Sequence, residues 1–204
     1  MTIDGRALRG DTTRQVVLDT ALEMFAKQGY RATSVRDIAA RSGITHPGLL
    51  YHFPTKQALL MAALKRRDEV DCIEEDDGVV EFADLDGRAL LAHLVAGAAK
   101  NATKRGLVEL FASLSVEATA PDHPAHEYFV DRYASLRATL VRGLEELDAA
   151  GQLRPGVVPA VTAAHLIALM DGLQIQWLLD PQTDMAGALA GYVNGLLVHP
   201  FDAG

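Results

Sequence analysis

Residues 33–56 contain several side chains whose types suit hydrogen bonding to a nucleic acid. Thr33, Ser34 and Arg36 stand where one short helix is expected to begin, and Lys56 stands where a later helix begins. A helix N-terminus exposes free N–H groups and carries partial positive charge, so a phosphate group binds well there. The side chains expected to meet base edges open the helix in between: Thr45, His46, Pro47, Gly48 and Leu49, with His46 the best polar candidate.

Short helices must hold these side chains in place, and local signals predict where the helices begin and end. Ser34 caps the first, and Gly43 ends it because glycine accepts the left-handed conformation of a helix stop. Thr45 caps the second, Pro47 lies in its first turn, and Pro54 ends it after about two turns. A helix this short is not stable alone. The pattern is typical of a helix-turn-helix, whose second helix is held by neighbours and enters a DNA groove.

The order and spacing of these residues resemble the TetR family. The resemblance is specific over residues 13–64 and looser at residues 171–181, which look like the end of the family's first dimerisation helix. It implies a bacterial, all-helical, homodimeric repressor that responds to a ligand. The residues that carry the resemblance are Ala21, Leu22, Phe25, Gly29, Thr33, Ser34, Ile38, Ala39, Gly43, Ile44, Gly48, Leu49, His52, Phe53, Lys56 and Leu59.

The second short helix departs from the family at one position. The resemblance implies a tyrosine that contacts the DNA backbone where this chain has Leu50. Tyr51 follows one residue later, about 100° around the helix, and it either contacts a phosphate or packs against the protein. Leu50 is expected to be buried or to contact a base methyl group. His52 either reaches a phosphate or closes the short helix, and Gly48 serves either close backbone approach to DNA or simple turn geometry.

Charge is divided unevenly along the chain. The net charge is −8, which by itself argues against a nucleic-acid binder. Residues 1–67, however, carry 11 Lys and Arg against 5 Asp and Glu, a net of +6, whereas residues 68–204 carry 8 against 22, a net of −14. A basic N-terminal segment joined to an acidic remainder attracts phosphate at one end only. The alternative is chance asymmetry of solvated surfaces.

The sequence contains no recognisable catalytic motif and no pattern of metal ligands. It has no glycine-rich phosphate loop, no HExxH and no Gly-x-Ser-x-Gly motif. His123 and His126 lie beside prolines, where capping is favoured over metal binding, and the acidic run 68–86 has no spaced ligand pattern. We therefore predict no cofactor and no metal. Because Cys72 is the only cysteine and no apolar run is long enough to span a membrane, we expect a cytoplasmic protein, and the resemblance to the TetR family implies a bacterial one.

Hydrophobic periodicity predicts an all-α fold of about nine helices. Beyond the short pair, helices are expected at about 13–28, from Lys56, and at 85–103, 106–119, 124–150, 158–179 and 184–198. We expect residues 1–67 to form a three-helix DNA-binding domain with a linking helix from Lys56. Residues 68–204 are expected to form a helical bundle for ligand binding and dimerisation.

A repressor of this plan needs an effector pocket and a dimer interface. An apolar pocket with a few polar groups predicts an unidentified small-molecule effector held by Asn101, Phe111, Tyr128, His165, Met170, Gln174 and Trp177. Glycines recurring every four residues in the last helix predict close packing between two copies, through Leu166, Leu169, Leu173, Gly187, Gly191, Val193, Gly195 and Leu196.

The sequence therefore predicts a ligand-responsive regulator, most simply a repressor, whose homodimer binds a palindromic operator in double-stranded DNA. Two alternatives remain. One is a helical dimer that binds a small molecule and has lost DNA binding, and the other is a DNA binder without a ligand. Salt-dependent, sequence-selective DNA binding distinguishes the first alternative from a repressor, and release of DNA by a metabolite distinguishes the second.

Overall fold

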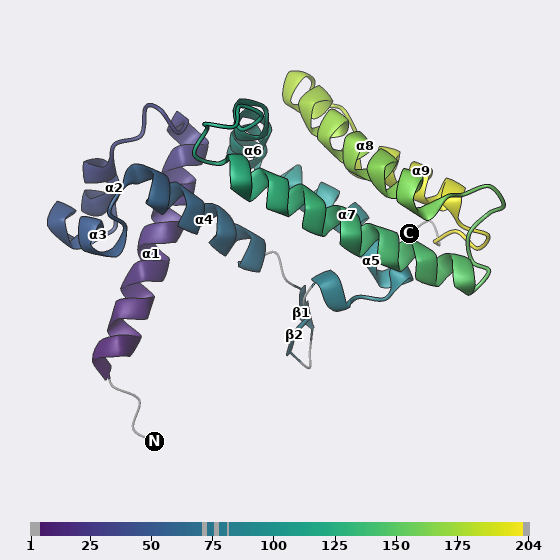
Figure 1. Cartoon of the computed structure of the whole chain (residues 1–204). Helices are drawn as coiled ribbons and strands as arrows, with labels where there is room; N and C mark the ends of the chain where they lie inside the picture. The colour runs from purple at the N-terminus through teal and green to yellow at the C-terminus, as the bar shows by residue number, and fades with distance from the viewer. Residues whose placement is uncertain (1–4, 71–72, 76–77, 81, 202–204) are drawn as a thin grey trace. The chain divides into compact units, whose positions relative to one another are not determined.

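The computed structural model describes residues 5–70, 73–75, 78–80 and 82–201 (Figure 1). Helices dominate this part of the chain, which confirms the predicted all-α class. Nine α-helices lie within the described residues: α1 Gly5–Gln28, α2 Val35–Arg41, α3 His46–His52, α4 Lys56–Val70, α5 Gly87–Asn101, α6 Arg105–Glu117, α7 His126–Ala149, α8 Pro159–Leu179 and α9 Met185–Leu196.

Most predicted helix bounds lie within two residues of those in the structure, and the exceptions are local. Helix α1 begins at Gly5, eight residues before the predicted start at Thr13. The acidic run, interpreted as a helix end followed by a loop, instead contains an antiparallel hairpin of strands β1 (Ile73–Glu75) and β2 (Gly78–Val80). β-Branched residues are enriched in such strands. A 3₁₀ turn at Phe82–Asp84 follows.

The chain forms two compact units. The N-terminal unit holds residues 1–71 together with 109–126, and the C-terminal unit holds residues 72–108 and 127–204. This division differs from the predicted boundary at residue 67, because most of α6 belongs to the N-terminal unit. Within that unit, Glu117 at the end of α6 lies 3.7 Å from the Arg31 guanidinium.

The N-terminal unit is built around α1 and α4, whose inward faces are apolar. Phe25, Leu59 and Leu64 are fully buried, as are Ile38 of α2 and Leu49 of α3. Burying such a side chain stabilises a fold by about 1.5–3 kcal/mol. The two short helices are therefore fixed by residues that they contribute to a shared core.

The C-terminal unit has its own core, to which α5, α7, α8 and α9 contribute. Helices α5 and α7 approach closely where Gly87 meets Gly143. A β-carbon at Gly87 would overlap the Gly143 carbonyl oxygen, and one at Gly143 would lie 2.6 Å from Leu90 Cδ2. A β-carbon at Gly87 would therefore push against backbone, whereas one at Gly143 would require the Leu90 side chain to move. The largest fully buried side chains of this core are Leu90, Leu91, Leu140, Leu144, Leu166 and Leu189.

Across the described ranges, none of the helices is both long enough and apolar enough to cross a membrane. The same residues contain no grouping of three or more His, Cys, Asp or Glu side chains that would hold a metal ion.

Candidate nucleic-acid interface

Side-chain caps set the starts of the two short helices. Ser34 is the N-cap of α2, and its Oγ accepts a hydrogen bond from the Arg36 N–H. Thr45 is the N-cap of α3, and its Oγ1 accepts from the Gly48 N–H at 3.2 Å. A β-carbon at Gly48 would lie 3.1 Å from that Thr45 oxygen, so the glycine leaves room for the cap. Gly43 adopts a φ of +70° in the turn between the helices.

Helix α3 turns one side toward solvent, and Tyr51 lies on that side. The tyrosine is 86% exposed, and Thr45 and Pro47 are exposed as well. Packing therefore does not explain Tyr51, although packing was one of its two predicted roles. Leu50 is half-buried. Leu49 is fully buried, so the prediction that it meets base edges is wrong: its side chain holds α3 in the core.

The structure also corrects the assignment of Thr33 to a phosphate contact. The side chain is 2% exposed, and its hydroxyl donates to the Gly29 carbonyl at 2.7 Å and to the Met24 carbonyl at 3.3 Å. These bonds tie the segment before α2 to the end of α1. The hydroxyl is therefore not available to a phosphate, whereas Ser34 is half-buried and Arg36 is exposed.

Lys56 stands at the first residue of α4, as predicted, and makes contacts within the protein. Its Nζ donates to the Arg31 carbonyl at 3.0 Å and lies 4.7 Å from the centre of the Tyr30 ring. Partial burial lowers the pKa of this lysine. Thr55 caps the helix, since its Oγ1 accepts from the Ala58 N–H. The ammonium is thus held beside the N–H groups of a helix end.

His46 and His52 flank the exposed side of α3, and both are half-buried. The His52 ring lies 5.5 Å from the Tyr51 ring in an edge-on arrangement. The short helix is closed by its backbone, because the Phe53 N–H donates to the Leu49 carbonyl at 2.8 Å. The His52 side chain is therefore not needed to end α3.

The residues predicted to line an effector pocket lie in different surroundings. Trp177 is buried, and Asn101, Tyr128, Met170 and Gln174 are half-buried, all within the C-terminal unit. Phe111 belongs to the N-terminal unit. His165 is exposed on the outer side of α8, so its assignment to an enclosed pocket is corrected.

A carboxylate that the sequence analysis did not single out lies half-buried in the C-terminal unit. The Tyr133 hydroxyl donates to Asp171 Oδ2 at 2.8 Å. Burial raises the pKa of Asp171, while the bond from Tyr133 and the charge of Arg132 oppose that rise. The signal available in the sequence was that Asp171 is the only acidic residue of α8 and lies nine residues before Asp180 of the Asp-Pro stop. In the same unit, Arg105 lies over the Trp177 ring at 5.6 Å and donates to the Leu178 carbonyl.

Helices α8 and α9 each leave a side open in the single chain. On α8 the exposed residues include Val161, Ile175 and Leu179, the last 82% exposed. On α9, added β-carbons at Gly191 and Gly195 would meet nothing within 4 Å. We call these five residues, with His165, Ala168 and Gly172, the open face.

Several predicted dimer residues lie on the opposite side of these helices. Leu166 and Val193 are fully buried, and Leu173 and Leu196 are nearly so. They fill the core of their own chain, so assigning them to the dimer interface is wrong. Leu169 is half-buried and packs against that core. Gly187 has a local role, because a β-carbon there would overlap the capping carboxylate of Asp184.

The two histidines of the DHPAHE segment serve the local backbone. His123 Nδ1 accepts from the Ala125 N–H at 3.2 Å, and its Nε2 lies 3.7 Å from Glu117. His126 Nδ1 is 2.8 Å from the Ala118 carbonyl oxygen. These contacts agree with the capping interpretation of the segment.

Two family models match the chain. The model of bacterial regulatory proteins of the tetR family matches residues 17–63. The model of the C-terminal part of BetI-type transcriptional repressors matches residues 87–199, which is more than half of the chain. The chain belongs to the TetR family. It is a DNA-binding transcription regulator and not an enzyme, as the sequence predicted.

Relatives with curated descriptions match this TetR-family regulator over part of its length. The repressor KstR2 of Rhodococcus jostii is 38% identical over 82 residues, which are 40% of this chain and 39% of KstR2. RutR of Escherichia coli is 36% identical over 53 residues, or 26% of this chain and 25% of RutR. The chain thus spans well under two thirds of the length of these relatives.

Solved structures share the fold over nearly the whole length. The Stenotrophomonas maltophilia repressor SmeT, solved with triclosan, has a TM-score of 0.76 at 22% identity and covers 95% of this chain and 96% of its own. A regulator from Saccharomonospora viridis, solved with choline, has a TM-score of 0.68 at 24% identity, covering 93% and 100%. At these identities the likeness concerns the TetR fold alone.

Proposed function

We propose that this TetR-family regulator is a repressor that binds a palindromic operator as a homodimer and is released by a small molecule. The observation that carries the DNA side of the proposal is the outward side of α3. There Tyr51 is 86% exposed near the end of α3, Thr45 caps the start of that helix, and Leu49 anchors the helix from behind. A rigid helix with an exposed, polar-tipped aromatic side chain suits a DNA groove.

The polar groups around α3 divide into two classes. The first class comprises residues that are proposed to bind phosphates, which fix register on DNA without reading sequence. Its members lie at the start of α2 (Ser34, Arg36), at the end of α3 (Tyr51, His52) and at the start of α4 (Lys56). Thr45, His46, Pro47 and Gly48 open α3 and are proposed to meet base edges. Two copies would place two such helices on half-sites about one helical turn, roughly 34–36 Å, apart.

The two classes predict different responses to mutation. Lys56→Ala should weaken binding to all sequences and lower the slope of log affinity against log salt by about one per head, because one phosphate contact is lost. His46→Ala should leave that slope unchanged and relax base preference by about 1–3 kcal/mol per half-site position. Fluorescence anisotropy against operator and scrambled duplexes at four salt concentrations measures both.

The matched control for Lys56→Ala is Lys104→Ala, an exposed lysine in the connection between α5 and α6. Lys104→Ala should reproduce the parent slope. If Lys56→Ala and His46→Ala both gave the affinity and selectivity of the parent protein, the assignment of the DNA interface would be wrong.

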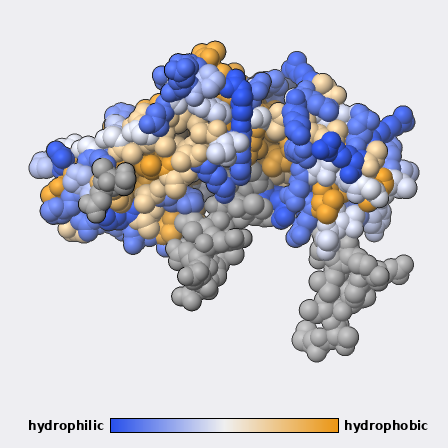
Figure 2. All heavy atoms as spheres, turned by 180° about the vertical axis from the view of Figure 1, so that it is seen from behind, coloured by the Kyte–Doolittle hydropathy of each residue, from blue (hydrophilic) through white to orange (hydrophobic). Residues whose placement is uncertain are grey.

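The open face supports the homodimer. Val161, Ile175 and Leu179 expose apolar surface on α8, and Gly191 and Gly195 leave the backbone of α9 accessible. Apolar surface combined with small residues permits two helix pairs to pack closely across a two-fold axis. Figure 2 shows hydrophobic residues, in tan and orange, spread over the surface of the C-terminal unit seen from behind.

An effector site in the C-terminal unit completes the proposal. Fold neighbours were solved with triclosan and with choline, which are both small organic molecules. In this chain the half-buried Tyr128, Met170 and Gln174 and the buried Trp177 supply an apolar lining with a polar group. The effector releases DNA only if it binds the DNA-incompetent state more tightly. Such a regulator acts in the cytoplasm, where bacterial DNA lies.

Trp177 reports on effector binding because it is the only tryptophan. A compound that displaces the operator should change the Trp177 emission at the same concentration, since the ring packs in the core beneath Arg105. A screen of neutral and cationic small molecules, with anisotropy and emission read in parallel, tests this. Compounds that release DNA from a Trp177→Phe variant with unaltered affinity would remove this side chain from the site.

A further inference from the structure

Helix α8 carries one carboxylate in a mostly apolar stretch. Asp171 is half-buried, it is the only acidic residue of the helix, and the helix contains no lysine or arginine. Moving a carboxylate partly out of water disfavours its charged form, and burial accordingly raises the pKa of Asp171. The C-terminal unit thus keeps an acid where packing alone would favour an apolar side chain, and such groups gather at binding sites.

The protein satisfies only part of the hydrogen-bonding capacity of this carboxylate. The Tyr133 hydroxyl of α7 donates to Asp171 Oδ2 at 2.8 Å, and the charge of Arg132 acts on the same group. Across the described residues, however, no lysine or arginine forms an ion pair with Asp171, and no donor reaches its Oδ1. A carboxylate offers about four acceptor sites. Asp171 therefore retains capacity for a positively charged partner.

Aromatic rings of α7 lie beside the carboxylate. Phe129 and Tyr133 are four residues apart, so they share one side of the helix, and their ring centres are 6.4 Å apart. Tyr128 stands edge-on to Phe129 at 5.1 Å. The face of an aromatic ring carries partial negative charge and attracts a cation. The carboxylate is thus bonded to one member of a group of rings that favours positive charge as well.

This carboxylate lies in the part of the C-terminal unit that the effector is proposed to occupy. Helices α7 and α8 run side by side in opposite directions (Figure 1), and the bond between Tyr133 and Asp171 joins them. Gln174 follows Asp171 by three residues, so the two side chains are neighbours on the surface of α8. Gln174 is half-buried like Asp171, and it supplies the polar group of the proposed pocket. The acid is therefore placed to contact a compound held there.

We propose that the effector is an organic cation with an apolar body, and that Asp171 binds its cationic nitrogen. This inference rests on the proposed release of DNA by a small molecule, and it names the chemical class of that molecule. The carboxylate neutralises the positive charge, the Tyr133 hydroxyl positions the carboxylate, and the rings of α7 contact the apolar body. A neutral compound gains nothing from the acid, and an anion is repelled by it.

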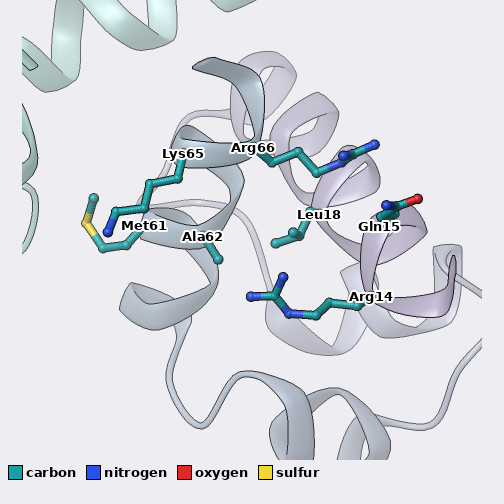
Figure 3. A pocket seen from close by; sticks show the side chains of 7 residues that line it. All are labelled: Arg14, Gln15, Leu18, Met61, Ala62, Lys65 and Arg66. Atoms are coloured by element: carbon teal, nitrogen blue, oxygen red, sulfur yellow. The ribbon is translucent and has the colours of Figure 1, made fainter. Parts of the chain in front are cut away.

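A cavity of about 370 Å³ in the N-terminal unit has the opposite electrostatic character. Its lining includes Arg14, Lys65 and Arg66 and no acidic residue. Figure 3 shows the Lys65 ammonium beside Met61, on the other side of α4 from the Arg14 guanidinium, and Arg66 is bonded to Asp19. Positive charges around a hollow repel a cation. An organic cation is therefore expected to bind in the C-terminal unit and not in this cavity.

The first measurement uses benzyltrimethylammonium, whose charge is the same at every pH, and benzyl alcohol, which has the same ring without the charge. Isothermal titration calorimetry at constant ionic strength compares the full-length parent with Asp171→Asn. The matched control is Asp148→Asn, which removes the same charge from an exposed position near the end of α7. The parent and the control should bind the cation more tightly than the alcohol. Asp171→Asn should raise the dissociation constant of the cation at least tenfold and leave that of the alcohol unchanged.

Urea unfolding separates this binding role from a structural one. Asparagine keeps the shape of the side chain and can still accept the bond from Tyr133. An acid whose pKa is raised in the folded state makes the protein less stable as the pH rises through that pKa. At neutral pH, Asp171→Asn should therefore unfold at a urea midpoint no lower than that of the parent. A lower midpoint would mean that the carboxylate stabilises the fold, against its assignment to a ligand.

Tyr133→Phe tests the same site by a second route, because it keeps the ring and removes the hydroxyl that donates to Asp171. That bond lowers the pKa of Asp171, so its loss should raise the pKa, while the charge of Arg132 is unchanged. A protonated carboxyl group no longer attracts a cation. As the pH is lowered, the affinity for benzyltrimethylammonium should begin to fall at a higher pH in Tyr133→Phe than in the parent. An unshifted pH profile would contradict binding through this pair.

Failure of this inference is distinguishable from failure of the proposed function. Equal affinity of Asp171→Asn and Asp148→Asn for the cation would overturn the inference, as would a parent protein that binds benzyl alcohol as tightly as the cation. Anisotropy of the operator duplex, read with the cation present, tests the function separately. Binding that depends on Asp171 and leaves the operator bound would uphold the site and contradict release of DNA by an organic cation.

Discussion

Gly191→Leu should raise the dimer dissociation constant by at least 100-fold, which corresponds to about 3 kcal/mol. A β-carbon at Gly191 meets nothing within 4 Å in the single chain, so the larger side chain fits the monomer. In the proposed dimer it would hold the two α9 backbones apart, because the glycine allows close approach there. Sedimentation velocity over a range of protein concentrations measures the change, and operator affinity should fall with it.

Ala138→Leu is the control for this experiment. Ala138 is exposed on α7, away from the open face, and the substitution adds an apolar side chain to a helix surface in the same way. The control should sediment like the parent protein. A Gly191→Leu protein that formed dimers as readily as Ala138→Leu would place the interface elsewhere.

Gly87→Ala should lower the free energy of unfolding by about 2–3 kcal/mol, the scale of overpacking in a core. The added β-carbon would overlap the Gly143 carbonyl oxygen, which belongs to backbone and cannot turn aside as a side chain can. Helices α5 and α7 would have to separate, and the Gly87 N–H would lose its bond to Glu146 Oε2. Urea unfolding followed by circular dichroism measures the change.

Gly97→Ala, in the middle of the same helix, separates this clash from helix propensity. A β-carbon at Gly97 meets nothing within 4 Å, so this substitution should stabilise the protein by about 0.5–1 kcal/mol. Equal unfolding midpoints for Gly87→Ala and Gly97→Ala would show that the crossing tolerates a side chain.

Helix bounds were predictable because the signals that set them are local. Ser34, Thr45 and Thr55 cap helices with their own hydroxyls, and Gly43 ends α2 in a left-handed conformation. Such bonds join residues two to four apart in the chain. Both partners therefore lie within one short stretch of sequence, and the helix bound can be predicted from that stretch alone. The hairpin was missed because its strands are only three residues long and lie within an acidic run.

The directions of side chains were harder to predict, for a different reason. Helix α3 has seven residues, too few turns for a period to show which side is buried, and Leu49 was therefore assigned to DNA. Helix α8 is apolar on both sides. Leu166 and Leu173 face the core, while Val161 and Ile175 face outward, and hydrophobicity alone does not separate these pairs. Thr33 was misassigned because its acceptors belong to α1 and the turn after it, which only the folded structure brings near.

Because Lys56 anchors the start of α4, a tilt of this helix produces its largest displacement at the far end. Because its first residue is bonded to the Arg31 carbonyl and rests on the Tyr30 ring, the start of α4 cannot pivot without carrying the loop before α2 along. A helix of 15 residues is about 22 Å long, so a tilt of about 10° at one end moves the other by about 4 Å. Displacement of this size exceeds the spacing of neighbouring base pairs, which is about 3.4 Å. A rigid contact at the start of α4 thus means that a small tilt of this helix is enough to change how the DNA-binding helices align with DNA.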